Sequence, residues 1–398
     1  MSGTDPFSNT NPPVRNLLQH IFVPRLFSDG LSYATRVDMI NIQDIYLSGK
    51  IVASPDITSR MLATTDNAGL LTSTDYGMNW SVLNTGASFT LNRCTGIAWN
   101  GKIFVAVGTG ANTILTSPDG ITWTPASNGF TGGVPGGWDV LWTGKVWIAV
   151  GSGTSIVLRS LDGITWTPPT ILPAAGVLYG ISYSRERLVA VGASGALGVI
   201  CYSDDDGITW TNSGPNFAYA AYDIVSNGSR WVAVGQQLAA GNANGTIFYS
   251  DDNALTWTAA TGIKFLTTGT SIDYHGGRFV AVGQDFAPST NTILTSQDGI
   301  TWSLTTGSKF TNYGDTILWN GKRWVSTGGN IAGLPAPVLV SDNGVAWVSS
   351  GGSAVPFSGI SQSFGLGSNN IWDNVPLSIN EAIFAISNRL QNVTGNLI

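Results

Sequence analysis

Ser160-Leu-Asp162-Gly163-Ile-Thr-Trp166 is one of seven nearly identical phrases in this chain of 398 residues. The tryptophans that end the phrases are separated by 43, 43, 44, 47, 45 and 45 residues. A fixed period of this length indicates a repeat protein, in which one repeat cannot bury its apolar face alone. The recurring acid or amide and the recurring tryptophan are Asp75 and Trp80, Asp119 and Trp123, Asp162 and Trp166, Asp205 and Trp210, Asp252 and Trp257, Asp298 and Trp302, and Asn343 and Trp347.

Each repeat contains four short runs that predict β strands. In the second copy the runs are residues 95–100, 102–108, 113–117 and 121–124, and pairs such as Asn100-Gly101 mark tight turns between them. Four antiparallel strands in a unit of about 40–45 residues are typical of one blade of a β-propeller. The sequence therefore predicts an all-β, seven-bladed β-propeller with four-stranded antiparallel blades.

The repeated phrase has a mechanical role in this prediction. Its Asp can accept backbone N–H bonds inside the turn, its Gly supplies a positive φ, and its Trp can pack beneath the turn. These phrases resemble Asp-boxes, also called BNR repeats, of the sialidase-like fold superfamily. The resemblance implies that the phrases lie at the blade periphery, away from any ligand site. Ala254 replaces the Gly in the fifth copy, and Asn343 replaces the Asp in the seventh.

The repeats divide the chain into four parts. Residues 50–350 are the predicted propeller, residues 1–49 an extended N-terminal arm, and residues 351–375 a closing segment or linker. Residues 376–398 predict a short amphipathic α-helix, because Ser378 and Glu381 form a capping box. The apolar side of this helix consists of Ile379, Ile383, Ile386, Leu390 and Val393. Their spacing favours a homotrimer through the helix, and docking of the helix on the chain's own propeller is the alternative.

The composition narrows the class of partners. Charged residues make up 11% of the chain and the net charge is −6, so a phosphate backbone is not an expected ligand. No run is long and apolar enough to enter a membrane, and no signal peptide is visible, so we expect synthesis in the cytoplasm. Cys94 and Cys201 are expected to be buried small apolar residues, and the two histidines predict no metal site or cofactor.

An enzymatic role is not expected. Sialidases of the superfamily that this chain resembles carry an Arg-Ile-Pro motif and a Tyr–Glu pair. This chain has no Arg-Ile-Pro and only two glutamates, Glu186 and Glu381. A glycosidase needs a spaced pair of carboxyl groups, and most aspartates here belong to the repeated phrases or to turns. Arg230, Arg278 and Arg323 recur beside the second strands and therefore predict a role in a hairpin.

Residues that break the repeat are the better candidates for ligand binding: Arg93, Trp138, Tyr219, Tyr222 and Tyr313. The recurring Phe89, Phe130, Phe217, Phe265 and Phe310 predict packing between blades instead. We expect a non-enzymatic structural or interaction protein, such as a fibre, spike or capsid-associated propeller at a virion or cell surface, which mediates assembly or attachment. A lectin-like carbohydrate-binding propeller and a degenerate glycosidase are the alternatives.

Overall fold

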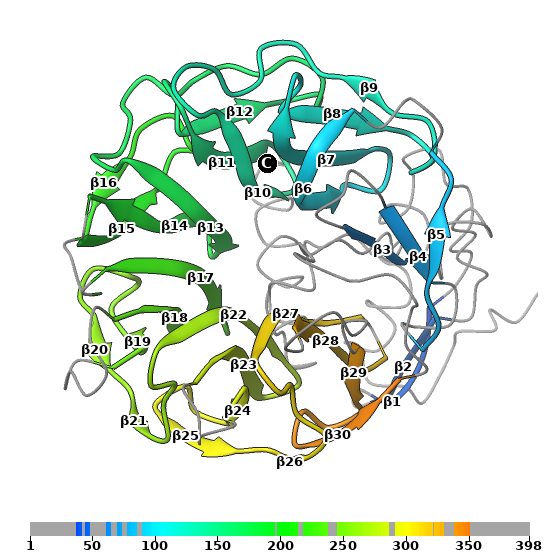
Figure 1. Ribbon diagram of the computed structural model, residues 1–398, viewed down its shortest axis with the longest axis vertical. Helices are drawn as coiled ribbons and strands as arrows, with labels where there is room; N and C mark the ends of the chain where they lie inside the picture. The colour runs from blue at the N-terminus through cyan, green and yellow to red at the C-terminus, as the bar shows by residue number, and fades with distance from the viewer. Residues whose placement is uncertain are drawn as a thin grey trace, which may run out of the picture. The chain divides into compact units, whose positions relative to one another are not determined.

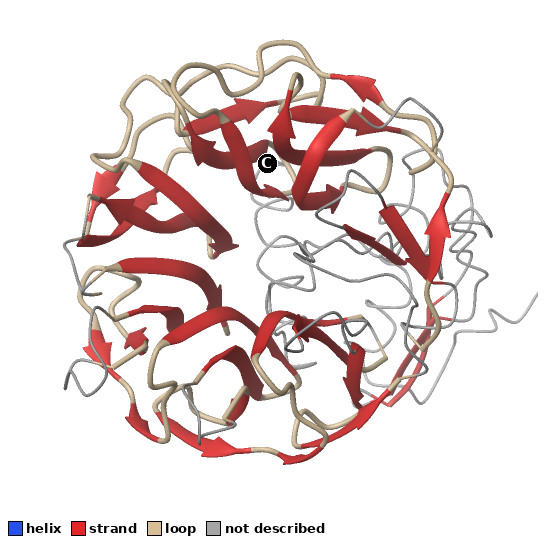
Figure 2. Ribbon diagram, in the orientation of Figure 1, coloured by secondary structure: helices blue, strands red, loops and turns tan. Residues whose placement is uncertain are grey.

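The computed structural model describes residues 37–41, 44–47, 61–64, 70–73, 78–85, 90–195, 197–213, 217, 219–237, 245–285, 291–320, 322–329 and 338–350. The chain divides into two compact units, one of Met1–Asp56 with Ser378–Ile398 and the other of Ile57–Leu377. All regular elements in the described ranges are β strands (Figure 2), as the predicted all-β class requires. None of these ranges contains a helix that could cross a membrane.

The described part of the first unit is a β-hairpin. Strand β1 (Val37–Asn41) pairs antiparallel with β2 (Asp44–Leu47), and Val37 stands opposite Leu47. The hairpin lies inside the segment that the sequence predicts to be extended. The predicted closing segment at residues 351–375 and the predicted helix at residues 376–398 lie outside the described residues.

In the second unit, small antiparallel sheets follow one another around a ring (Figure 1). We call each sheet a blade and number its strands from the middle of the ring outwards. The first strands are β6 (Leu91–Trp99), β10 (Gly136–Trp142), β13 (Val177–Ser184), β17 (Ala220–Ser226), β22 (Thr268–His275) and β27 (Tyr313–Trp319). The second strands are β3 (Met61–Thr64), β7 (Phe104–Gly110), β11 (Trp147–Ser152), β14 (Arg187–Ser194), β18 (Trp231–Gln236), β23 (Arg278–Gln284) and β28 (Trp324–Gly329).

The outer half of each blade is built from shorter strands. The third strands are β4 (Leu70–Ser73), β8 (Ile114–Ser117), β12 (Val157–Ser160), β15 (Leu197–Ser203), β19 (Ile247–Ser250), β24 (Ile293–Ser296) and β29 (Val338–Ser341). The fourth strands are β5 (Ser81–Leu83), β9 (Thr124–Pro125), β16 (Thr211–Asn212), β20 (Thr258–Ala259), β25 (Thr301–Leu304) and β30 (Ala346–Ser349).

Several fourth strands are shorter than the sequence predicts. Strand β9 covers only Thr124–Pro125, and in the β10–β12 blade the fourth position is a single bridge between Arg159 and Thr167. The repeated turn explains the difference, because Ile121 and Thr122 donate their amides to the Asp119 carboxylate. These amides are therefore used within the turn instead of extending the sheet.

The second strands from β7 to β23 are buried on both faces. Phe104 and Ala106 on β7 pack in one cluster with Leu70 of the preceding blade. Val105 and Val107, which point the other way, pack with Trp147 and other residues of the following blade. A strand covered on both faces needs a continuous apolar run, and this explains the recurring Val-Ala-Val sequence. The predicted packing residues Phe130, Phe217, Phe265 and Phe310 are also buried, whereas Phe89 lies outside the described residues.

The outer edges of several blades are covered by the segment that links one blade to the next. Strand β21 (Thr261–Gly262) pairs parallel with β25, and β26 (Thr306–Gly307) pairs parallel with β30. Single parallel bridges join Ser127 to Thr165 and Ile171 to Thr209. An unpaired edge strand is open to pairing with another chain, so these linkers protect the rim while tying neighbouring blades together.

The β3–β5 blade packs against the β27–β30 blade. Leu71 on β4 lies in one apolar cluster with Val325, Val338 and Val340. Arg323, which directly precedes β28, also donates a hydrogen bond from its Nη1 atom to the Met78 sulfur. The succession of blades therefore returns to its beginning within this unit.

Candidate ligand-binding site

A β-bulge recurs at one position of the first strands, which lie nearest the middle of the ring (Figure 1). A bulge leaves one residue out of the hydrogen-bond ladder and redirects its side chain. This position can therefore vary without loss of the sheet. The residues left out of the ladder are Thr95 on β6, Trp138 on β10, Tyr179 on β13, Tyr222 on β17, Thr270 on β22 and Asp315 on β27.

Where the bulged residue is threonine, its hydroxyl links neighbouring blades. Thr95 Oγ1 donates to the Gly137 carbonyl at 2.5 Å, and Thr270 Oγ1 donates to the Gly314 carbonyl at 2.6 Å. On β10, β13 and β17 the same position holds an aromatic side chain. Three successive blades therefore hold a ring at the position where β6 and β22 hold a hydrogen-bonded threonine.

The three rings contact one another across the blades. The ring centroids of Trp138 and Tyr179 are 5.5 Å apart, and those of Tyr179 and Tyr222 are 5.2 Å apart. The Arg93 guanidinium lies 5.8 Å from the Trp138 ring centroid. Tyr222 donates its hydroxyl to Gln236 Oε1 at 2.6 Å. Within the described part of the chain, the buried indole N–H of Trp138 has no hydrogen-bond partner.

Tyr219 completes this group, which we call the inner-strand cluster and define as Arg93, Trp138, Tyr179, Tyr219 and Tyr222. Tyr219 is 38% exposed, and Arg93 is also exposed. Burial, together with the neighbouring Tyr179 and Tyr219, raises the pKa of Tyr222 to about 12. Burial, and to a smaller extent the neighbouring Tyr219, also raises the pKa of Tyr179. Tyr179 and Tyr222 therefore keep their protons at neutral pH and remain uncharged hydrogen-bond donors.

Two partly buried acids directly follow cluster residues. Asp139 accepts the Val140 amide at 2.7 Å and the Ile181 amide of the next blade at 3.1 Å. Burial raises its pKa to about 8, and the negative charge of Asp223 adds to this shift, against the hydrogen bonds to Asp139. Both acids lie on first strands, so the strands next to the cluster carry protonatable groups as well as rings.

Asp223 has more hydrogen-bond donors than Asp139. It accepts the Ile224 amide at 2.7 Å, the Ile272 amide at 2.9 Å and the Ser271 hydroxyl at 2.8 Å. Burial raises its pKa to about 6, although these hydrogen bonds oppose the shift. Both oxygens of each acid are thus engaged with backbone or hydroxyl donors.

The arrangement is suited to binding. Aromatic rings, uncharged hydroxyls, a side-chain amide and one guanidinium are grouped together, whereas the nearby carboxyl groups bind backbone amides. The described residues contain no group of three or more His, Cys, Asp or Glu side chains placed to hold a metal ion.

The structure brings together four of the five residues that the sequence singled out as ligand candidates. Tyr313 stands apart, because it starts β27 and the whole of β22 separates that strand from β17. The sequence analysis missed Tyr179. The signal was available, since Tyr179 precedes Gly180-Ile181 as Trp138 precedes Asp139-Val140 and Tyr222 precedes Asp223-Ile224.

The repeated turns form a second, peripheral set of sites with similar hydrogen bonds, although the turns of Asp205 and Asp252 are one residue longer than the others. In one of them, Asp162 accepts the Ser160 hydroxyl at 2.9 Å and the Ile164 and Thr165 amides at 2.8 and 2.7 Å. The Trp166 indole donates to the Gly163 carbonyl at 3.0 Å, and Trp166 is fully buried. Trp123, Trp210, Trp302 and Trp347 are also buried, Trp80 and Trp257 are partly buried, and Asp75 lies outside the described residues.

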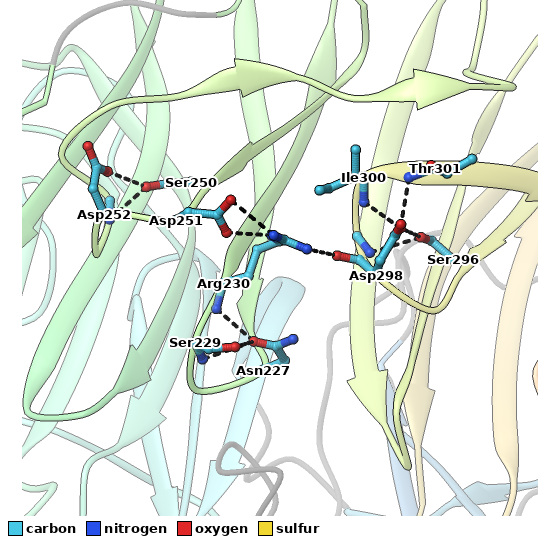
Figure 3. Close-up of polar contacts among 12 residues, drawn as sticks. Asn227, Ser229, Arg230, Ser250, Asp251, Asp252, Ser296, Asp298, Ile300 and Thr301 are labelled. Carbon is cyan, nitrogen blue, oxygen red and sulfur yellow. Dashed lines mark hydrogen bonds and ion pairs between the residues drawn. The ribbon is translucent and has the colours of Figure 1, made fainter.

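Arg230, one of the three arginines with a predicted hairpin role, also contacts the next blade. Arg230 forms an ion pair with Asp251 at 2.6 Å in its own blade and donates through Nη1 to the Asp298 carbonyl in the turn of the next blade (Figure 3). Arg187 pairs in the same way with Asp204 and donates to the Asn253 carbonyl. One guanidinium has enough N–H donors to bind both a carboxylate of its own blade and a backbone carbonyl of the next blade. These arginines therefore link neighbouring blades.

The ring of antiparallel blades, with variable residues on its innermost strands and repeated turns at its rim, defines a β-propeller. Residues 78–372 match the family described as DUF6242 beta propeller domain, and the chain belongs to this family. No curated protein matches the chain.

Several solved structures are similar to the chain at low sequence identity. One is YCF48 bound to D1 peptide, with 15% identity, 67% of this chain and 83% of that chain covered, and a TM-score of 0.48. Another is the computationally designed Ika8 protein, with 13% identity, 65% and 77% covered, and a TM-score of 0.43. A chain of the Nidogen/Laminin complex has 10% identity, 61% and 96% covered, and a TM-score of 0.42.

Proposed function

We propose that this protein is a non-enzymatic attachment propeller that binds carbohydrate through the inner-strand cluster. The observation that carries the proposal is the replacement of threonine by Trp138, Tyr179 and Tyr222 at three successive bulges. Departures from a local rule that lack a structural gain are expected at functional sites. Here the interblade hydrogen bond of the threonine is given up for rings grouped on neighbouring first strands.

The chemistry of the cluster favours a sugar over other ligands. The apolar faces of a sugar ring can stack on aromatic side chains, and its hydroxyls require uncharged donors and acceptors. Tyr179, Tyr222 and Gln236 supply such groups. A chain of net charge −6 with one cationic side chain in the cluster is poorly suited to a nucleic acid.

The scaffold of this proposal is a closed ring of seven blades whose repeated turns are Asp-boxes. The hydrogen bonds at Asp119, Asp162 and Asp298 support this assignment because each carboxylate accepts the same two following amides. The Asn343 amide oxygen accepts the equivalent two amides at 2.9 Å each. A virion or cell surface is the proposed location, since attachment through weak sites gains from repeated display.

A second candidate function is assembly into a larger particle. The aliphatic side chains of the rim support it, because Leu161, Ile164 and Ile171 are 73%, 51% and 54% exposed. A homotrimer through residues 376–398 is the proposed form of this assembly. Light scattering on the full chain and on a chain ending at residue 375 tests it, and an unchanged mass would rule out the trimer.

Glycan-array binding tests the first proposal. Replacing Tyr179 by Ala removes the central ring and about 1 kcal/mol of stacking, so affinity for a bound glycan should fall about fivefold. Tyr183→Ala is the matched control, because Tyr183 lies on the same strand and is also partly buried. Equal losses in the two variants, or no binding by the wild type, would contradict carbohydrate recognition. Hydrolysis of any fluorogenic glycoside would contradict the non-enzymatic role.

A further inference from the structure

One kind of carboxyl bridge recurs between neighbouring first strands. Asp139 on β10 accepts the amide of the next residue through Oδ1 and the Ile181 amide of β13 through Oδ2. Asp223 on β17 makes the same two contacts with Ile224 and with Ile272 of β22. Asp273 on β22 accepts the Tyr274 amide at 2.7 Å and the Trp319 amide of β27 at 2.6 Å.

Two of the three bridges are attached to the inner-strand cluster. Asp139 follows Trp138 and Asp223 follows Tyr222, so each acid fixes the strand that carries a ring. Asp273 follows Ser271 and Ile272 and adjoins no ring of the cluster. The structure thus contains two bridges beside the cluster and one similar bridge away from it, whose Asp273 lies three positions after the bulged Thr270.

The strand that carries Tyr179 is held between the two acids. On one side the Ile181 amide binds Asp139 at 3.1 Å. On the other side a Cβ atom added to Gly180 would lie 2.7 Å from the Tyr222 carbonyl oxygen and 3.3 Å from Asp223 Oδ1. Small movements of either carboxyl group are therefore transmitted to the strand of Tyr179, the central ring.

We propose that Asp139 and Asp223 are positioning residues of the inner-strand cluster, and that ring placement and ligand affinity follow the protonation of these two carboxyl groups. The affinity part of this inference rests on the proposed function. The ring-placement part concerns the unliganded protein and can be tested without any ligand.

The groups around the two acids make the effect of a proton predictable. Asp139 feels the charge of Asp223 on β17, and its oxygens accept the Val140 and Ile181 amides. Asp223 accepts the neutral Ser271 hydroxyl and the Ile272 amide of β22. Burial raises the pKa of both acids, to about 8 for Asp139 and about 6 for Asp223. Near pH 7 the two carboxyl groups together therefore hold about one proton, which they lose as the pH rises above 8.

Raising the pH above 8 adds a second negative charge beside the first. The two charges repel, and the strands bearing Trp138 and Tyr222 should separate around β13. If binding requires protonated Asp139, the dissociation constant should rise up to about tenfold for each pH unit above the pKa. Asp139→Asn should remove this rise, because the amide stays uncharged at every pH.

The decisive experiment follows Trp138 by ¹⁹F NMR in the full chain labelled with 5-fluorotryptophan, with its resonance assigned by Trp138→Phe. The resonance should titrate between pH 5 and pH 9, and Asp139→Asn should remove the upper part of that titration and leave the part that belongs to Asp223. Asp223→Asn should move the midpoint to lower pH, because it removes the charge that raises the pKa of Asp139. Asp273→Asn is the matched control and should leave the midpoint unchanged.

Two results would overturn the inference: a Trp138 resonance that does not respond to pH, or an Asp273→Asn midpoint displaced as far as that of Asp223→Asn. A panel of immobilised neutral and acidic oligosaccharides at pH 7 and pH 9 provides the binding readout. Absence of binding at pH 7 counts against the proposed function, whereas equal wild-type affinity at both pH values counts against this inference. The two failures are therefore distinguishable.

Discussion

The rim and the inner strands of this propeller use the same repeat in opposite ways. At the rim, Asp119, Asp162 and Asp298 each accept the same serine hydroxyl and the same two amides. On the inner strands, one bulge position holds threonine, tryptophan, tyrosine or aspartate according to the blade. Constant positions close the turns, and variable positions give each blade its own side chain, so function is to be sought where the repeat is broken.

The pKa shifts of the acids in the two regions also have opposite directions. The Thr165 amide, helped by other hydrogen bonds and opposed by burial, lowers the pKa of Asp162. Burial would raise the pKa of Asp252, but the hydrogen bonds from Thr256, Ser250 and Leu255 outweigh it and lower the value to about 2. On the inner strands burial prevails over hydrogen bonding. The rim therefore favours ionised carboxylates and the inner strands favour protonated ones.

The largest expected difference between the two regions is in the free energy of unfolding after a Trp→Ala change. Trp166 is fully buried, so its removal should cost about 3–5 kcal/mol. Trp138 is only partly buried and packs edge-on against Tyr179, which is itself partly exposed. Trp138→Ala should therefore cost much less and chiefly weaken ligand binding. Urea denaturation measures both, and equal costs would contradict the division of roles.

The pH dependence of stability should show two opposing slopes. Folding raises the pKa of Asp139 to about 8 and that of Asp223 to about 6, from an ordinary value of 3.8. The contribution of these two acids to the free energy of unfolding is therefore complete below pH 4 and is lost as the pH rises through the folded values. The turn acids act in the opposite sense, since their contribution is present above pH 4 and is lost as the pH falls towards 2.

Denaturation of the wild type between pH 3 and pH 9 tests these slopes. We expect the free energy of unfolding to fall on the order of 1 kcal/mol per pH unit between pH 5 and pH 8 and to level off above pH 8. Asp139→Asn should flatten this alkaline slope and leave the acid slope intact, whereas Asp162→Asn should affect only the acid side. If the alkaline slope persists in Asp139→Asn, groups other than Asp139 cause it.

The turn carboxylate gives a smaller effect. Asp162→Ala leaves the Ile164 and Thr165 amides without their acceptor and should cost about 1–2 kcal/mol. Asp162→Asn should cost less than half of that, because Asn343 already accepts the two equivalent amides in another turn. Thermal unfolding of the two variants distinguishes a requirement for an acceptor from a requirement for charge. An Asn variant as unstable as the Ala variant would show that charge is needed.

The sequence predicts the rim far better than the inner strands. The period and the Ser-Asp-Gly-Trp residues predict the turn hydrogen bonds, because these connect residues at most four positions apart. The inner-strand cluster joins Trp138 to Tyr179 and Tyr222 through the packing of separate blades. The repeat pointed to residues that break the pattern, but it could not reveal which of them meet. Tyr179 was missed and Tyr313 was included for this reason.

The smallest predicted effect is an increase in stability, at Ala254 in the fifth turn. Ala254 adopts a φ of 67° at a position where Gly120, Gly163 and Gly299 have 71°, 74° and 72°. A left-handed backbone is strained for any residue with a Cβ atom, so Ala254→Gly should relieve strain. The gain is reduced because a buried methyl group is lost and because glycine is freer in the unfolded chain.

We therefore expect Ala254→Gly to stabilise the protein by about 0.5 kcal/mol, measured as a shift in the urea midpoint. Gly163→Ala is the reverse change in another turn and should destabilise it, since its new Cβ atom would lie 2.7 Å from Ile103 Cδ1 at a φ of 74°. A loss of stability in both variants would mean that the fifth turn has adapted to alanine. In that case the rim would also vary from blade to blade, and constancy of sequence would no longer separate the rim from the inner strands.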